Sequence, residues 1–127
     1  MMNLNIIREA NWNRSGVYKI FFDDLRDPTD IYPDAKPGEW LVIRNIADFK
    51  DAIETIGVPT FVSFDNDLGV VDGIKEECKE VVKWIVFEKE LDISGMDFKI
   101  HSANSSGVRE YMTGTLNNWK KELRRKN

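Results

Sequence analysis

The chain alternates between short, almost wholly apolar runs and longer segments in which an apolar residue recurs every three or four positions. The runs are rich in β-branched and aromatic residues, a pattern typical of strands buried on both faces of a parallel sheet. Four such strands are predicted, at residues 17–24, 40–44, 60–64 and 98–101.

Three segments have the helical period instead. Their apolar stripes run through Phe49, Ala52, Ile53 and Ile56, then Ile74, Cys78, Val81 and Ile85, and finally Val108, Met112, Leu116, Trp119 and Leu123. Asn45 is suited to cap the first helix and Gly57 to end it. Between the first two strands, residues 26–39 hold three prolines and several aspartates, so this segment is expected to be a loop.

The predicted order is strand, loop, strand, helix, strand, helix, strand, helix. Strands that alternate with helices indicate a parallel sheet with right-handed crossovers. We therefore expect a small doubly wound α/β sheet, flavodoxin-like, with four strands in the order 2-1-3-4. Residues 17–127 form this one domain, and residues 1–16 are mixed in character and are interpreted as an N-terminal extension.

Charge and composition narrow the class of protein. No apolar run is long enough for a membrane span, and the single cysteine, Cys78, is consistent with a reducing cytoplasm. A net charge of −4 argues against a protein that wraps nucleic acid over its whole surface. The cationic run at 120–126 is interpreted either as a solvated helix end, which such runs usually are, or as a local contact for nucleic acid.

Acidic residues follow two of the predicted strands. Asp23 and Asp24 end the first strand, and Asp65 and Asp67 follow the third. With the order 2-1-3-4 these strands are neighbours at the switch point, where open α/β sheets bind ligands. Clustered carboxylates favour a hard dication, so we predict that these four bind Mg²⁺ or Mn²⁺. The alternative is that both pairs only form turns.

The only histidine, His101, follows the fourth strand and precedes a helix N-terminus, where free N–H groups favour an anion. His101 is interpreted either as a general acid or base or as an orienting residue. Arg26 is interpreted as a phosphate ligand or as an ion-pair partner of the acids, and the same two roles are open to Arg44. The remaining candidate phosphate ligands are Ser102, Asn104, Ser106 and Gly107.

The acids that end the first and third strands resemble those of response-regulator receiver domains. In that family the first-strand acids and a third-strand aspartate bind Mg²⁺, and the latter accepts phosphate. Asp23, Asp24 and Asp65 match these positions. The chain differs in its loop between the first two strands and in lacking a fifth strand with a lysine.

A closer resemblance is to the cyclic-phosphate processing receiver domains. It rests on the motifs F-D-D-L-R-D-P, V-I-R-N, S-F-D-N-D-L-G, K-W and I-H-S-A-N-S-S-G. The resemblance implies a receiver-like fold and the handling of cyclic phosphate ends in RNA repair.

The expected function is that of a metal-dependent phosphoesterase with Asp65 and His101 as catalytic residues. Its substrate would be an RNA 2′,3′-cyclic phosphate end or a cyclic nucleotide. Two other functions are open: a phosphoacceptor module phosphorylated on Asp65, and a non-catalytic domain that binds a nucleotide or a protein.

Overall fold

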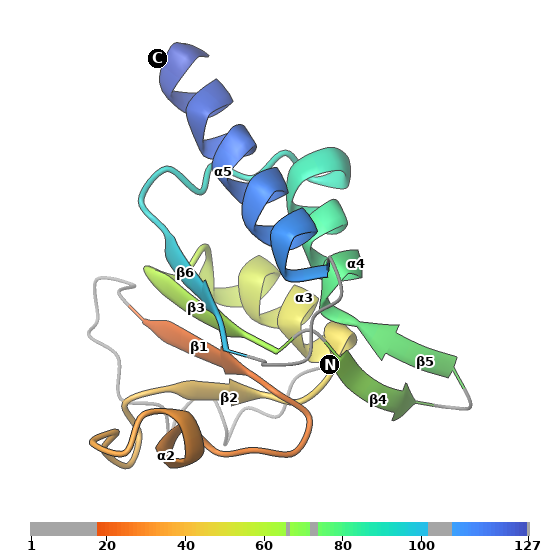
Figure 1. Cartoon of the computed structure of the whole chain (residues 1–127). Coiled ribbons are helices and arrows are strands. Elements are labelled where there is room, and N and C mark those ends of the chain that lie inside the picture. Colours follow the sequence, from red (N-terminus) through yellow and green to blue (C-terminus); the bar gives the residue numbers. More distant parts are fainter. Residues whose placement is uncertain (1–17, 66, 72–73, 102–107, 127) are drawn as a thin grey trace.

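The computed structural model describes residues 18–65, 67–71, 74–101 and 108–126. Its centre is a four-stranded parallel sheet with the strand order β2-β1-β3-β6 (Figure 1). The strands are β1 (Lys19–Phe22), β2 (Leu41–Ile43), β3 (Phe61–Phe64) and β6 (Asp97–Ile100). These are the four strands expected from the sequence, so the predicted receiver-like α/β sheet and its order 2-1-3-4 are confirmed.

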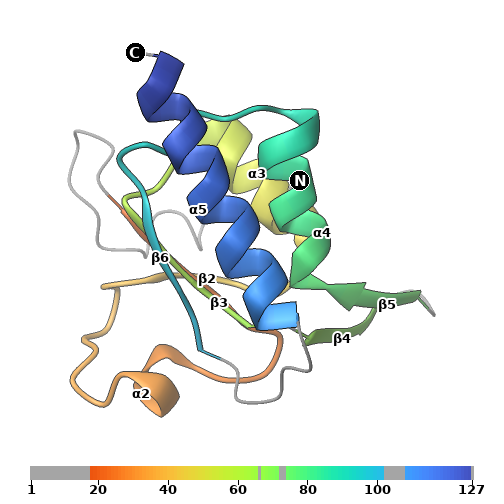
Figure 2. The same cartoon turned by 45° about the horizontal axis from the view of Figure 1, so that its top comes forward.

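The connections between the strands cross both faces of the sheet. The chain moves from β1 to β2 in one direction, and from β2 through β3 to β6 in the other. Because parallel crossovers are right-handed, this reversal sends the first connection over one face and the later ones over the opposite face. Figure 2 shows α2 (Pro28–Ile31) on one side of the sheet, and α3 (Ile46–Ile56), α4 (Cys78–Lys83) and α5 (Val108–Lys126) on the other.

The first connection is largely the loop that its prolines predict. Its one helical element, α2, is a single turn with Pro28 in the first position. The backbone N–H of Asp27 donates to Asp30 Oδ2 at 2.7 Å, which satisfies one group at the start of this turn. A loop with one helical turn therefore covers the face that a full crossover helix would otherwise cover.

The main core lies between the sheet and the three helices on its other face. The helix α3 begins as predicted, because Asn45 Oδ1 accepts the N–H of Asp48 at 2.8 Å. It ends at Gly57, whose φ of 112° favours glycine. The strand side chains in this core come from alternate positions and are buried: Ile20, Phe22, Leu41, Ile43, Val62, Phe64 and Ile100.

The prediction of a helix that begins at Ile74 was wrong for its first turn. Ile74–Glu77 forms the strand β5, which pairs antiparallel with β4 (Asp67–Val71), and α4 begins at Cys78. Asp-Gly between β-branched residues is a strong hairpin signal, and here it prevails over the helical spacing of Ile74 and Cys78. After α4 the chain continues into a π-helical segment, η1 (Trp84–Glu88).

Two expectations concern the chain beyond this core. Residues 1–16, interpreted as an extension, lie outside the described residues. Among the helices that the structure describes, none combines the length and the apolar character that a membrane span requires.

Candidate functional site

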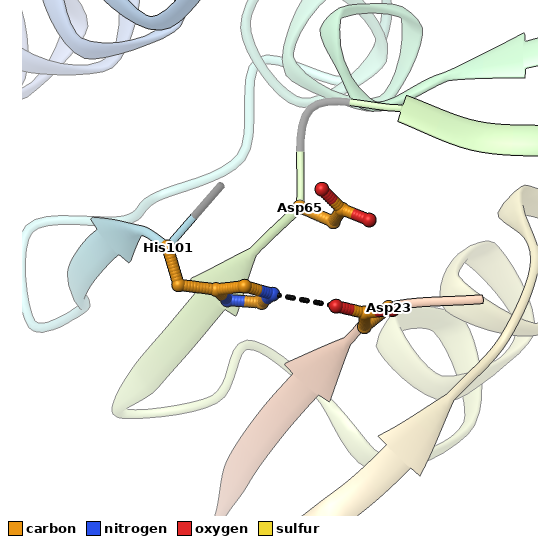
Figure 3. Close-up of side chains that lie close together, drawn as sticks. All are labelled: Asp23, Asp65 and His101. Atoms are coloured by element: carbon orange, nitrogen blue, oxygen red, sulfur yellow. Dashed lines mark hydrogen bonds and ion pairs between the residues drawn. The ribbon is translucent and has the colours of Figure 1, made fainter. Parts of the chain in front are cut away.

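Three residues with polar side chains stand directly after three strands of the sheet. Asp23 follows β1, Asp65 follows β3 and His101 follows β6. Their backbone N–H groups donate to Ile43 O, Phe22 O and Phe64 O at 3.1, 2.9 and 2.8 Å, respectively. The parallel ladders thus extend one residue beyond each strand, and the three side chains meet at one edge of the sheet (Figure 3).

The carboxylate of Asp23 accepts hydrogen bonds on both of its oxygens. Its Oδ1 accepts the backbone N–H groups of Leu25 and Arg26, both at 2.9 Å. Its Oδ2 accepts Arg26 Nε and His101 Nε2, also at 2.9 Å. Burial raises the pKa of Asp23, but these donors and the charge of Arg26 outweigh it, so the pKa lies below its usual value. Asp23 is therefore an ionised carboxylate at neutral pH.

Arg26 bridges the two acids of the site. Besides its bond to Asp23, its Nη2 lies 3.4 Å from Asp65 Oδ1. The Asp65 side chain is 8% exposed, whereas that of Arg26 is 39% exposed and reaches solvent. A positive charge consequently already stands between the carboxylates in this structure.

Arg44 holds the backbone of the turn that carries Arg26. Its Nη1 donates to the carbonyl oxygens of Asp23 and Arg26 at 3.1 and 2.5 Å. Its Nη2 pairs with Asp27 Oδ1 at 2.6 Å. Of the two roles open to Arg44 from the sequence, the structure therefore shows the ion pair.

His101 lies beneath the surface of the site, with no exposed side-chain area. Its Nε2 faces Asp23, and its Nδ1 lies 2.7 Å from Ser63 Oγ, which in turn lies 2.8 Å from Tyr32 Oη. The imidazole ring stacks on the Phe21 ring, with the two ring centroids 4.8 Å apart and an interplanar angle of 3°. Burial lowers the pKa of His101, and the acids Asp23 and Asp65 offset only part of this effect.

The sequence interpretation did not identify Ser63, Tyr32 or Phe21. The two-residue period of a strand would have found Ser63, because it precedes Asp65 by two positions and shares its face. The same period relates Phe21 to Asp23. Tyr32 had no such signal, since it comes from an irregular connection.

The structure brings together four of the predicted site residues: Asp23, Asp65, His101 and Arg26. Asp24 is half-buried and is not part of the close group formed by the described side chains. Asp67 begins β4, and its side chain lies outside the description. Four predicted phosphate ligands also lie outside the described residues: Ser102, Asn104, Ser106 and Gly107.

The group formed by Asp23, Asp65 and His101 is close enough to hold a metal ion. One ligand atom from each residue lies within 4.8 Å of the others. Carboxylate oxygens are the metal ligands that a hard dication prefers, whereas an imidazole nitrogen is better suited to softer metals. The carboxylate pair thus fits a hard cation, provided that the cation takes the place of the Arg26 guanidinium.

Comparison with known proteins places the chain in a family. Residues 18–118 match the model of the cyclic-phosphate processing receiver domain, a range that includes every strand and every described residue of the site. Neither the curated proteins nor the solved structures gave a match. The match spans most of the sequence, and so the chain belongs to the family of cyclic-phosphate processing receiver domains.

Proposed function

We propose that this protein is a metal-dependent phosphoesterase that opens a cyclic phosphate, either an RNA 2′,3′-cyclic end or a cyclic nucleotide. One observation supports this most: Asp23 and Asp65 lie together at the C-terminal edge of the sheet, with Arg26 between them. Paired carboxylates suit a dication and a guanidinium suits phosphate. The family is one of cyclic-phosphate processing, which supports the class of substrate.

In the proposed reaction, water adds to phosphorus and one P–O bond of the ring breaks. A proton of the water passes to the released oxygen, and the product is a phosphate monoester. The proposed ligands of a divalent cation are Asp23, Asp24, Asp65 and Asp67. When bound, Mg²⁺ or Mn²⁺ supplies charge neutralisation at the phosphate and orientation of the water.

In this proposal Arg26 binds the carboxylates of the site when no cation is present and the substrate phosphate when a cation is bound. Without a cation its guanidinium pairs with Asp23 and Asp65, as in the structure. With a cation held by the carboxylates, Arg26 would give up its bonds to Asp23 and Asp65, and its planar donors would bind the substrate phosphate. The further phosphate contacts remain as predicted from the sequence: Ser102, Asn104, Ser106 and Gly107.

We assign His101 to orienting Asp23. Both of its ring nitrogens have a hydrogen-bond partner and its side chain has no exposed area. Transfer of a proton to substrate would first require one of these hydrogen bonds to break. General acid–base catalysis by His101 stays a prediction, which variants at this position test.

The experiment is single-turnover cleavage of an RNA oligonucleotide with a 2′,3′-cyclic phosphate end, alongside a cyclic mononucleotide. With Mg²⁺ or Mn²⁺ we expect cleavage by the wild type, and a loss of about 100-fold or more in Asp65→Asn and with a chelator. Asp97→Asn is the matched control, because Asp97 lies at the other end of β6 and its side chain is 83% exposed. Absence of cleavage by the wild type with either metal would contradict the proposal and favour a non-catalytic binding domain.

A second candidate function is phosphorylation of Asp65. It is favoured by the place of Asp65 directly after β3, beside a cationic side chain. It is disfavoured because the described parallel sheet ends at β6, and within it no fifth strand brings a lysine to the edge. We expect no stable adduct by intact-mass measurement after incubation with acetyl phosphate. A stoichiometric adduct that disappears in Asp65→Asn would favour this second function.

The basic end of α5 provides a proposed accessory contact for an RNA substrate. Its last turn carries Arg124, Arg125 and Lys126, and Figure 1 shows this end of α5 pointing away from the sheet. Contacts of this kind with phosphates weaken as salt rises. The proposal therefore includes a longer RNA that is bound more tightly than a mononucleotide at low salt.

A further inference from the structure

A chain of hydrogen bonds connects the loop over the sheet to the acidic site. It runs from Tyr32 Oη to Ser63 Oγ at 2.8 Å, from Ser63 Oγ to His101 Nδ1 at 2.7 Å, and from His101 Nε2 to Asp23 Oδ2 at 2.9 Å. We propose that Ser63 and Tyr32 are positioning residues, which hold the His101 imidazole through Nδ1 so that its Nε2–H points at the Asp23 carboxylate. Their role in turnover rests on the proposed function, whereas the arrangement itself does not.

The position of one hydrogen follows from the partners alone. An ionised carboxylate accepts hydrogen bonds and donates none. His101 Nε2 therefore carries the hydrogen in its bond to Asp23, whatever the charge of the ring. Nδ1 is left to Ser63, whose hydroxyl either donates or accepts. Ser63 thus fixes the ring without competing for Nε2.

The size of Ser63 is as important as its hydroxyl. The strand β3 lies between β1 and β6, so the His101 side chain must cross β3 to reach Asp23. Ser63 is the residue on β3 beneath this path, since it bonds to Nδ1 and pairs in register with Phe21, on which the ring stacks. A small side chain leaves space for the imidazole, and its hydroxyl holds the ring in that space.

Tyr32 is well placed to hold Ser63 because its own ring is fixed. The Tyr32 ring stacks on Trp40, with ring centroids 5.1 Å apart, and lies edge to face with Phe21, with centroids 6.5 Å apart. Lys99 Nζ lies 5.6 Å from the centroid of the Tyr32 ring. Ser63 has no exposed area, so its second hydrogen bond comes from the protein interior. The loop that occupies the first crossover consequently contributes a residue to the support of the site.

The test uses the fact that the chain contains one histidine. In ¹⁵N-labelled full-length protein without a histidine tag, the imidazole signals all come from His101. Two-bond ¹⁵N–¹H correlations report which ring nitrogen is protonated, and solvent exchange of the ring N–H reports how firmly it is held. The measurement is made on the metal-free protein at neutral pH, so it requires no turnover.

We expect the wild type to show a protonated Nε2 whose hydrogen exchanges slowly. Ser63→Ala should accelerate that exchange about tenfold and shift the Nδ1 signal, because one buried hydrogen bond is lost. Tyr32→Phe should change both signals in the same direction by less, although Tyr32 does not bond to His101. Tyr18→Phe is the matched control, since its hydroxyl bonds to Gly57 O elsewhere, and it should leave His101 unchanged.

The proposal is overturned if Nε2 is unprotonated in the wild type, or if the His101 signals in Tyr32→Phe match those of the wild type. Tyr32 is only half-buried, so its variant remains informative even if Ser63→Ala fails to fold. The expected spectra together with an inactive wild type would support the positioning chain and contradict only the proposed function. Active wild-type protein with unchanged spectra in the variants would support the proposed function and contradict the positioning chain.

Discussion

On the face of the sheet covered by α3, α4 and α5, the strand side chains are apolar and all but Phe98 are buried, whereas the opposite face combines aromatic rings with the polar groups of the site. Both faces are made by the same strands. In β1, Ile20 and Phe22 face the helices, and Phe21 lies under the His101 ring. In β3, Phe64 belongs to the core and Ser63 bonds to His101.

The difference between the faces comes from what covers them. Successive strand residues point to opposite faces, so alternate positions can have separate roles. Three helices exclude water from one face and favour apolar side chains there. A loop covers the other face, and it brings Tyr32 and Arg26 to the strand ends. Substitutions on the helix-covered face should therefore affect mainly stability, and those on the site face mainly function.

The largest effect is expected for His101→Ala on the site face. General acid–base groups contribute ~10²–10⁴-fold, so a fall of the single-turnover rate on that scale at saturating metal would contradict the orienting role assigned to His101. A residue that only orients Asp23 should cause a smaller loss. His101→Gln should then restore much of the rate, because its side-chain amide has both an NH₂ group that donates and a carbonyl oxygen that accepts.

The control for these variants is metal affinity, which should change little because the carboxylates remain. Near-wild-type rates in both His101→Ala and His101→Gln would remove His101 from the mechanism. The comparison of the two faces would then fail at His101, whose side chain has no exposed area.

The next effect is expected for Phe49→Ala on the helix-covered face. Phe49 has no exposed area, and its ring lies 4.9 Å from Phe22 and 6.1 Å from Phe64. Removal of a buried phenyl ring lowers the free energy of unfolding by about 3–5 kcal/mol, which denaturant titration measures.

Tyr32→Phe on the other face is the matched variant, with an expected loss of only about 0.5–1.5 kcal/mol for one hydrogen bond. Similar losses in the two variants would show that both faces contribute equally to stability.

An effect smaller than that of Phe49→Ala is expected from the cation. Saturation at a hundredfold excess over Kd should raise the free energy of unfolding by about 2.7 kcal/mol, and thermal unfolding with Mg²⁺ or Mn²⁺ measures it. Asp65→Asn should largely abolish the gain. An identical thermal shift in wild type and Asp65→Asn would place the cation elsewhere.

The smallest expected effect concerns Arg26. Because its guanidinium contacts both carboxylates, Arg26→Gln should tighten the binding of Mg²⁺ or Mn²⁺ about three- to tenfold, as measured by calorimetry. Weaker binding in Arg26→Gln would contradict the exchange of guanidinium for cation.

The sequence by itself determined the sheet and the position of two of its four predicted acids, Asp23 and Asp65. Each strand has a local apolar pattern, and strands that alternate with helices indicate a parallel sheet, for which the order 2-1-3-4 was expected before any contact was known. The same reasoning correctly placed Asp23, Asp65 and His101 at one edge, since the C-terminal ends of parallel strands share it. The caps of α3 were equally local, because Asn45 and Gly57 act on neighbouring residues.

Only the tertiary structure decided how those side chains pair. The reach of His101 across β3, its bond to Ser63 and the approach of Tyr32 join residues 31 to 78 positions apart. The position of Arg26 between Asp23 and Asp65 likewise depends on the path of an irregular loop. A periodic pattern describes which face a residue occupies, but the partners on that face are chosen by packing and by burial of charge, which act across the whole fold.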